Sequence, residues 1–188
     1  MQTYPAGTLA GAGSFRCRDC GFHVALQALD EVPECPNCGG DQFARASMFD
    51  TSDPDPPTAH EDDTDWLEAV RDSIEREGQY FILREGDHVS VMPLTREWTK
   101  IGRSLTADIR LDDPTVSRRH ALVCSQPQAV RVLDDRSLNG VFLNGERTEW
   151  AELHDGDELQ IGRYRLYFIE RGGGPADGEQ LVVGLQAD

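Results

Sequence analysis

Three short stretches between Ile101 and Gly145 carry side chains that could bind an anion. They are Gly102-Arg103-Ser104, Ser117-Arg118-Arg119-His120 and Ser137-Leu138-Asn139-Gly140. Each lies where an alternating apolar run gives way to turn residues, which predicts loops between strands. Arginine guanidinium, serine hydroxyl and asparagine amide groups are the donors that a phosphate and a neighbouring peptide main chain require. The residue types therefore predict a binding surface on loops rather than a reaction centre.

Basic residues gather around these loops although the protein is strongly acidic. The 188-residue chain has 34 acidic against 18 basic residues, a formal net charge of −16. Between Arg96 and Arg119, in contrast, six basic residues stand against four acidic ones. The overall charge disfavours non-specific binding to nucleic acid or to an anionic membrane, because both depend on Lys and Arg. The local excess of positive charge suits a single phosphate group.

Four of the five cysteines form two CxxC pairs, Cys17 with Cys20 and Cys35 with Cys38, fourteen residues apart. Such paired knuckles are typical of a metal site, and four thiolates are a common tetrahedral set for structural Zn²⁺. A redox pair would need only one CxxC. A unit of about 30 residues buries too little apolar surface to fold alone. We therefore expect a closed zinc site that stabilises the fold and performs no catalysis, with His23 as a surface strand residue.

Composition and periodicity divide the chain into five segments. They are a flexible leader over 1–14, a zinc-binding unit over 15–45, an acidic linker with one short helix over 46–78, a β domain over 79–170 and a flexible tail over 171–188. The helix is predicted over about 65–77, because Trp66, Val70 and Ile74 form one apolar stripe. From residue 79 onward, short alternating runs with frequent turn residues predict a mainly β fold, a two-sheet sandwich.

The loop motifs resemble those of the forkhead-associated (FHA) domain family. The resemblance covers about 79–170 and rests on Gly102-Arg103-Ser104, Ser117-x-x-His120, Asn139-Gly140 and Asp155-Gly156-Asp157, in matching order and spacing. It implies an eleven-stranded sandwich of two antiparallel sheets that binds phosphothreonine in partner proteins and has no catalytic activity. The cysteine unit similarly resembles the zinc-ribbon family. Together they suggest a bacterial type of FHA protein with an N-terminal zinc ribbon.

The resemblance implies roles for individual loop residues. The residues expected to contact a phosphopeptide are Arg103, Ser104, Ser117, Arg118 and Asn139. Among them, Arg103 and Ser117 would hold the phosphate, and Asn139 would bond the peptide main chain. The residues expected to support the loops are Gly102, His120 and Gly140. Many family members carry Thr after the Asn-Gly pair, where this chain has Val141.

An acidic stretch ahead of the predicted helix contains Thr64, with Leu67 three residues later. FHA domains commonly read the residue three after the phosphothreonine. In some small bacterial members an acidic N-terminal extension carries a phosphorylated Thr that docks on its own domain. By this resemblance, Thr64 is a candidate kinase target that would occupy the site intramolecularly. The alternative is that Thr64 serves only to cap the helix.

These observations favour a phosphothreonine-dependent adaptor whose partners are phosphorylated proteins and a Ser/Thr kinase. The alternative is a nucleic-acid-associated regulator acting through the ribbon. It is disfavoured, because residues 15–45 contain three basic and five acidic residues. An enzyme ranks third, since the sequence has no P-loop, no nucleophile elbow and no open metal site. The absence of a long apolar run or a signal peptide predicts a cytoplasmic location without a membrane partner.

Overall fold

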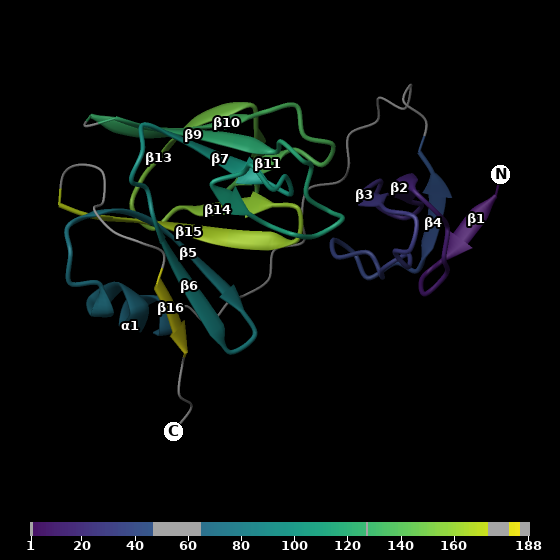
Figure 1. Cartoon of the computed structure of the whole chain (residues 1–188), viewed down its shortest axis with the longest axis horizontal. Helices are drawn as coiled ribbons and strands as arrows, with labels where there is room; N and C mark the ends of the chain where they lie inside the picture. The colour runs from purple at the N-terminus through teal and green to yellow at the C-terminus, as the bar shows by residue number, and fades with distance from the viewer. Residues whose placement is uncertain (1, 47–64, 127, 173–180, 185–188) are drawn as a thin grey trace.

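The computed structural model of the chain describes residues 2–46, 65–126, 128–172 and 181–184 (Figure 1). Within these ranges the chain forms a small N-terminal β-sheet and a larger β-sandwich with one helix. The predicted mainly β fold is therefore confirmed. No helix in the described ranges is long and apolar enough to cross a bilayer.

The N-terminal unit is a four-stranded antiparallel sheet in the spatial order β1-β4-β2-β3. Its strands are β1 (Thr3–Pro5), β2 (Gly13–Cys17), β3 (His23–Leu26) and β4 (Gln42–Arg45). The side chains of Phe15, Val24 and Phe43 are fully buried in its core. The order of the strands leaves β1 and β3 at the two edges of the sheet.

The first residues differ from the flexible leader expected over 1–14. Thr3–Pro5 pairs with β4, and the ring of Tyr4 packs edge to face against Phe15 with centroids 5.1 Å apart. The composition does not predict this strand, because a Gly- and Ala-rich segment is typical of a flexible chain and the contact of Tyr4 forms only on folding. The N-terminal unit therefore begins at β1.

The sandwich consists of a five-stranded and a seven-stranded sheet. The first contains, in spatial order, β13 (Trp150–Leu153), β10 (Ala129–Asp134), β9 (Ala121–Gln126), β7 (Trp98–Gly102) and β8 (Ile109–Arg110). The second contains β12 (Glu146–Thr148), β11 (Val141–Leu143), β14 (Glu158–Ile161), β15 (Tyr164–Arg171), β5 (Gly78–Glu85), β6 (His88–Pro93) and β16 (Leu181–Gly184). Alternate side chains of both sheets form the core between them, among them Phe81 and Phe168 of the seven-stranded sheet and Val123 of the five-stranded sheet.

Three details of the sandwich differ from the sequence-based expectations. The pair β7–β8 is parallel, although two antiparallel sheets were expected. Apolar alternation predicts nine strands in this domain, which correspond to β5–β11, β14 and β15. It misses β12 and β13, whose side chains are mostly exposed or half-buried. Strand β16 pairs with β6 within the tail that was expected to be flexible.

The helix α1 (Asp65–Ser73) covers the outer face of the seven-stranded sheet, on a different side of the sandwich from the N-terminal unit (Figure 1). Its predicted stripe is confirmed, since Val70 and Ile74 are buried and Trp66 packs edge to face on Tyr167. The helix ends four residues before the predicted end. There the guanidinium of Arg171 donates to the carbonyl oxygens of Arg71 and Ile74, which satisfies groups that a further helical turn would use.

Candidate functional site

Three loops at one end of the sandwich are held together by hydrogen bonds from their main-chain N–H groups. The N–H of Arg103 donates to the carbonyl oxygen of Ser117 at 3.0 Å, and the N–H of Ser104 donates to that of Arg118 at 3.1 Å. The N–H of Leu138 donates to the hydroxyl of Ser117 at 3.1 Å. The loops that follow β7, β8 and β10 therefore lie side by side, and they bring four of the five expected contact residues into one region.

His120 and Gly102 hold these loops from beneath. The imidazole of His120 is fully buried, its Nδ1 accepts from the N–H of Ser117 and its Nε2 donates to the carbonyl of Gly140, each at 3.0 Å. Burial lowers the pKa of His120, so the ring is neutral at neutral pH. A Cβ at Gly102 would clash with the carbonyl oxygen of Arg118, which explains why the position requires glycine.

The position of Gly140 favours glycine, because its φ of 84° lies in the left-handed region. Its N–H donates to the hydroxyl of Ser137 at 2.8 Å. The loop after β10 is therefore fixed on both sides of Asn139.

The phosphate-binding candidates present unused donors. Within the described part of the chain, the guanidinium Nε of Arg103 is buried and has no hydrogen-bond partner. Ser117 is half-buried and Arg118 is exposed beside it. Ser104 and Arg118 also line a pocket of about 270 Å³ together with Lys100, Thr106 and Arg119. This arrangement leaves cationic and hydroxyl groups available to an anion.

Arg119, which lines this pocket, and Arg136, which lines a second one, both lie beside Arg118. Arg119 forms a double hydrogen bond to the carboxylate of Asp135 at 2.7 and 2.8 Å, so its charge is largely offset. Arg136 lines the adjoining surface with Arg118. Arg136 was not among the predicted contact residues, because an arginine in a polar turn resembles any solvated turn residue. Only its position beside Arg118 marks it as a further candidate.

Asn139 contacts the N-terminal unit. Its side chain is only 2% exposed and lies against β3. Its Oδ1 accepts from the N–H of His23 at 2.7 Å, and its Nδ2 donates to the carbonyl oxygens of His23 at 2.6 Å and Thr115 at 2.8 Å. Asn139 therefore binds a peptide main chain within this protein. His23 is 7% exposed, so its expected place at the surface is wrong.

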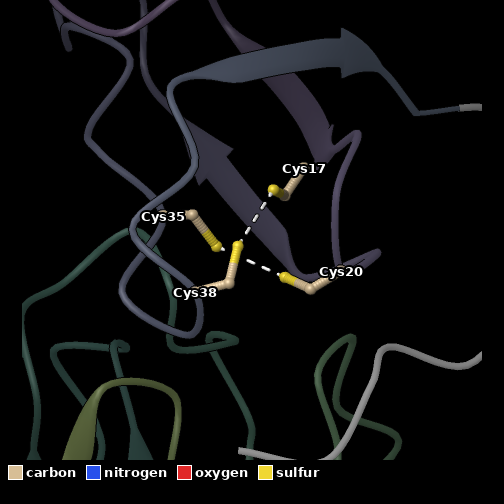
Figure 2. A group of neighbouring side chains, drawn as sticks. All are labelled: Cys17, Cys20, Cys35 and Cys38. Atoms are coloured by element: carbon tan, nitrogen blue, oxygen red, sulfur yellow. Dashed lines mark hydrogen bonds between the residues drawn. The ribbon is translucent and has the colours of Figure 1, made fainter. Parts of the chain in front are cut away.

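The four cysteines of the N-terminal unit point toward one another (Figure 2). The sulfurs of Cys17 and Cys38 are 3.7 Å apart, those of Cys20 and Cys35 are 3.5 Å apart, and all four lie within 4.8 Å of one another. Thiolates about 2.3 Å from a tetrahedral zinc ion would be roughly 3.8 Å apart. The donor set and its spacing fit a tetrahedral metal ion.

The environment of Cys35 also suits a metal ligand. Burial raises the pKa of its thiol, while the backbone N–H groups of Asn37 and Cys38 oppose that rise. A bound cation would overcome the burial and hold the sulfur as a thiolate. Gly21 and Gly39, which follow Cys20 and Cys38, have φ values of 77° and 74° and allow the two tight turns.

Comparison with known families agrees with both parts of this description. Residues 99–162 match the family model of the FHA domain, and residues 1–47 match that of a zinc-ribbon containing domain. The chain therefore contains an FHA domain preceded by a zinc ribbon, as its motifs predicted. The FHA domain is a binding domain rather than an enzyme.

The chain is also similar to individual proteins. It is 49% identical over 77 residues to the oxoglutarate dehydrogenase inhibitor of Corynebacterium diphtheriae, covering 41% of this chain and 54% of the relative. It is 47% identical over 81 residues to the glycogen accumulation regulator GarA of Mycobacterium tuberculosis, covering 43% of this chain and 48% of the relative. The chain thus spans about half the length of the curated relatives it matches.

Among solved structures, Mycobacterium tuberculosis EmbR in complex with a low-affinity phosphopeptide is similar to this chain. The TM-score is 0.47 and the sequence identity 29%, over 61% of this chain and 30% of that one.

Proposed function

We propose that the FHA domain binds phosphothreonine-containing proteins reversibly, as an adaptor in Ser/Thr kinase signalling. The observation that carries this proposal is the buried, unpartnered Nε of Arg103, on a loop whose main chain bonds that of Ser117 and Arg118. A buried donor without a partner is costly, and a phosphate oxygen would satisfy it. The names of the similar proteins, an inhibitor and a regulator, support a regulatory role.

In this proposal each loop residue has a separate task. Arg103 and Ser117 bind the phosphate, with Ser104 and Arg118 beside them, while Asn139 bonds the main chain of the ligand. Gly102, His120 and Gly140 maintain the loops. Each charge-assisted hydrogen bond contributes roughly 1.5–3 kcal/mol. A few such bonds account for micromolar affinity, which corresponds to about −8 kcal/mol.

The proposed metal of the ribbon is a structural Zn²⁺ held by Cys17, Cys20, Cys35 and Cys38. Zinc suits four thiolates at tetrahedral spacing, and with four protein ligands it has no open position for catalysis. Elemental analysis of the purified protein should give one zinc per chain. Replacement of Cys20 by Ser should lower that content, whereas Cys124→Ser, outside the cluster, should leave it unchanged.

Thr64 remains a proposed kinase target whose phosphorylated form would dock on the FHA loops. It lies outside the described residues and immediately precedes α1 in sequence. Enzymatic phosphorylation tests the proposal, because a carboxylate substitute lacks the geometry of a phosphate. Phosphorylated Thr64 should reduce the affinity for an external phosphopeptide. Unchanged affinity would contradict this internal docking and leave helix capping as the role of Thr64.

The central test is binding to phosphothreonine peptides selected from a degenerate library, followed by fluorescence anisotropy. The full chain should bind a phosphorylated peptide and ignore its unphosphorylated form. Arg103→Ala should weaken binding by at least about 100-fold, because it removes a buried charged donor. Arg131→Ala is the matched control, since Arg131 lies on β10 and pairs with Glu152. Equal binding by the Arg103 and Arg131 variants would contradict the proposed site.

A further inference from the structure

Strand β3 is an edge strand of the zinc ribbon, so half of its main-chain N–H and carbonyl groups point away from its own sheet. On its inner side β3 pairs with β2, and the carbonyl of Phe22 accepts from the N–H of Cys17. Main-chain groups of successive residues in a strand point to alternate sides. Those of His23 and Ala25 therefore point outward from the edge of the sheet, toward the FHA loops.

The FHA loops bond the main chain of this edge strand. Asn139 bonds both the N–H and the carbonyl of His23, at 2.7 and 2.6 Å. The N–H of Ala25 donates to the carbonyl oxygen of Pro114 at 2.7 Å. Three hydrogen bonds thus hold residues 23–25 through their main chain, two of them made by the side chain of Asn139 and one by the carbonyl oxygen of Pro114.

The amide of Asn139 has no donor left for a second peptide. Its two N–H groups already donate to the carbonyls of His23 and Thr115, and an amide nitrogen carries only two. Asn139 and His23 are 2% and 7% exposed, so the contact excludes solvent. A ligand whose carbonyl requires Asn139 can bind there only after His23 has left.

We propose that β3 of the zinc ribbon is an internal ligand of the FHA domain, which a bound phosphopeptide must displace. The proposal rests on the proposed function of the FHA loops. β3 reads His-Val-Ala-Leu and carries no hydroxyl that a kinase could phosphorylate. It therefore occupies the main-chain part of the site at Asn139, and it supplies no phosphate to Arg103 and Ser117.

Charge and tethering both favour the docked ribbon. Residues 15–45 carry an excess of two acidic residues, and residues 96–119 carry an excess of two basic residues. Since both units belong to one chain, docking is intramolecular and benefits from a high effective concentration. A phosphopeptide overcomes this advantage through its charge-assisted bonds to the phosphate part of the site. The apparent affinity for phosphopeptide is then reduced by the fraction of molecules in which β3 is docked.

Docking itself can be measured without a peptide by amide hydrogen exchange on the full, metal-loaded chain. The amides of His23 and Ala25 should be protected in the wild type. Asn139→Ala should speed exchange at His23 at least about ten-fold, because it removes the acceptor of that N–H. The amide of Val24, which faces β2, serves as the internal control for an intact ribbon. Unprotected His23 and Ala25 amides in the wild type would overturn the proposal.

Competition is tested with Ala25→Pro, which removes the N–H that donates to Pro114. Proline is tolerated on the free side of an edge strand, so the ribbon and its metal content should survive. The variant should bind a phosphothreonine peptide about ten-fold more tightly than the wild type. Ala25→Ser keeps the N–H and should bind as the wild type does. In the wild type, saturating peptide should remove the protection of His23 and Ala25.

The outcomes separate this proposal from the proposed function. If peptide binds and Arg103→Ala abolishes binding, but His23 and Ala25 stay protected, β3 is no competitor and only this inference fails. Equal affinity of the Ala25→Pro variant and the wild type would also overturn it. If His23 and Ala25 are protected but no variant binds a phosphothreonine peptide, the proposed function fails and the competition with it.

Discussion

The ribbon and the sandwich are both β structures, but they differ in what stabilises them. The core of the sandwich contains 18 buried apolar side chains between two sheets, whereas that of the ribbon contains nine, three of which are cysteines. A unit as small as the ribbon depends on a metal, because its buried surface cannot offset the entropy of ordering the chain. We therefore expect the ribbon and the sandwich to lose their structure independently.

The two units also differ in what they contribute to ligand binding. The sandwich contributes the loops and the proposed phosphate site, and the ribbon contributes the strand that bonds Asn139. A change confined to the ribbon would therefore alter access to the loops without damaging them. The proposed zinc site then affects ligand binding indirectly, through the position of β3.

Metal removal should have the largest effect, because it should unfold the ribbon and leave the sandwich folded. Structural zinc contributes on the order of 10–16 kcal/mol to small zinc-binding peptides, so chelation should unfold the ribbon completely. The sandwich should keep its own unfolding transition. Tryptophan fluorescence reports this transition, because Trp66, Trp98 and Trp150 all lie outside the ribbon. Affinity for phosphopeptide should rise as β3 leaves Asn139. A single shared transition for both units would contradict their independence.

Truncation of a core side chain of the sandwich should destabilise the sandwich and leave the ribbon intact. Phe168 is fully buried and packs against Phe81, with ring centroids 5.7 Å apart. Phe168→Ala should lower the free energy of unfolding of the sandwich by about 3–5 kcal/mol, through lost burial and the cavity left behind. Urea unfolding followed by tryptophan fluorescence measures this. The zinc content should stay at the wild-type level, and loss of the metal would show that the ribbon depends on the sandwich.

The neighbouring arginines of the loop after β8 offer a finer comparison. Arg118→Ala should weaken phosphopeptide binding by about 1.5–3 kcal/mol, roughly 10- to 150-fold, since Arg118 is exposed beside the proposed phosphate site. Arg119→Ala should have less effect, because Asp135 already engages the guanidinium of Arg119. Anisotropy titrations of both variants provide the measurement. Equal losses would indicate that only the general positive charge matters.

The smallest expected effect concerns pH. The pKa of His120 is lowered by burial in the folded state, so below about pH 6.5 the unfolded chain binds a proton that the folded chain resists. The stability of the sandwich should therefore fall as the pH drops below that value, by at most about 1.4 kcal/mol per pH unit from this group. Urea unfolding between pH 7 and pH 5 measures the slope. His120→Gln should be less stable throughout but have a shallower slope.

The sequence was informative wherever a local pattern has one structural meaning. The CxxC pairs predicted the cysteine cluster, and the stripe of Trp66, Val70 and Ile74 predicted the helix and its buried face. The pair Asn144-Gly145 is typical of a two-residue hairpin turn, and it joins β11 and β12 with φ values of 51° and 82°. Such signals are readable because the backbone geometry or ligand chemistry requires those residue types.

Elements without such a signal were missed or misjudged. Strands β12 and β13 have mostly exposed or half-buried side chains, so their sequences lack apolar alternation. The N-terminal strand is held by its pairing with β4 and by the contact of Tyr4 with Phe15. Arg136 stands out only because folding places it beside Arg118. In each case the deciding partner is distant in sequence or belongs to another element.

The sequence by itself determined the two kinds of domain, the set of metal-binding sulfurs and the donor groups on the FHA loops. Only the tertiary structure decided that Asn139 bonds the main chain of His23. The physical reason is that every residue except proline offers the same backbone N–H and carbonyl. A contact made through the main chain therefore leaves little trace in side-chain identity, and it becomes visible only when the fold places one edge strand against one loop.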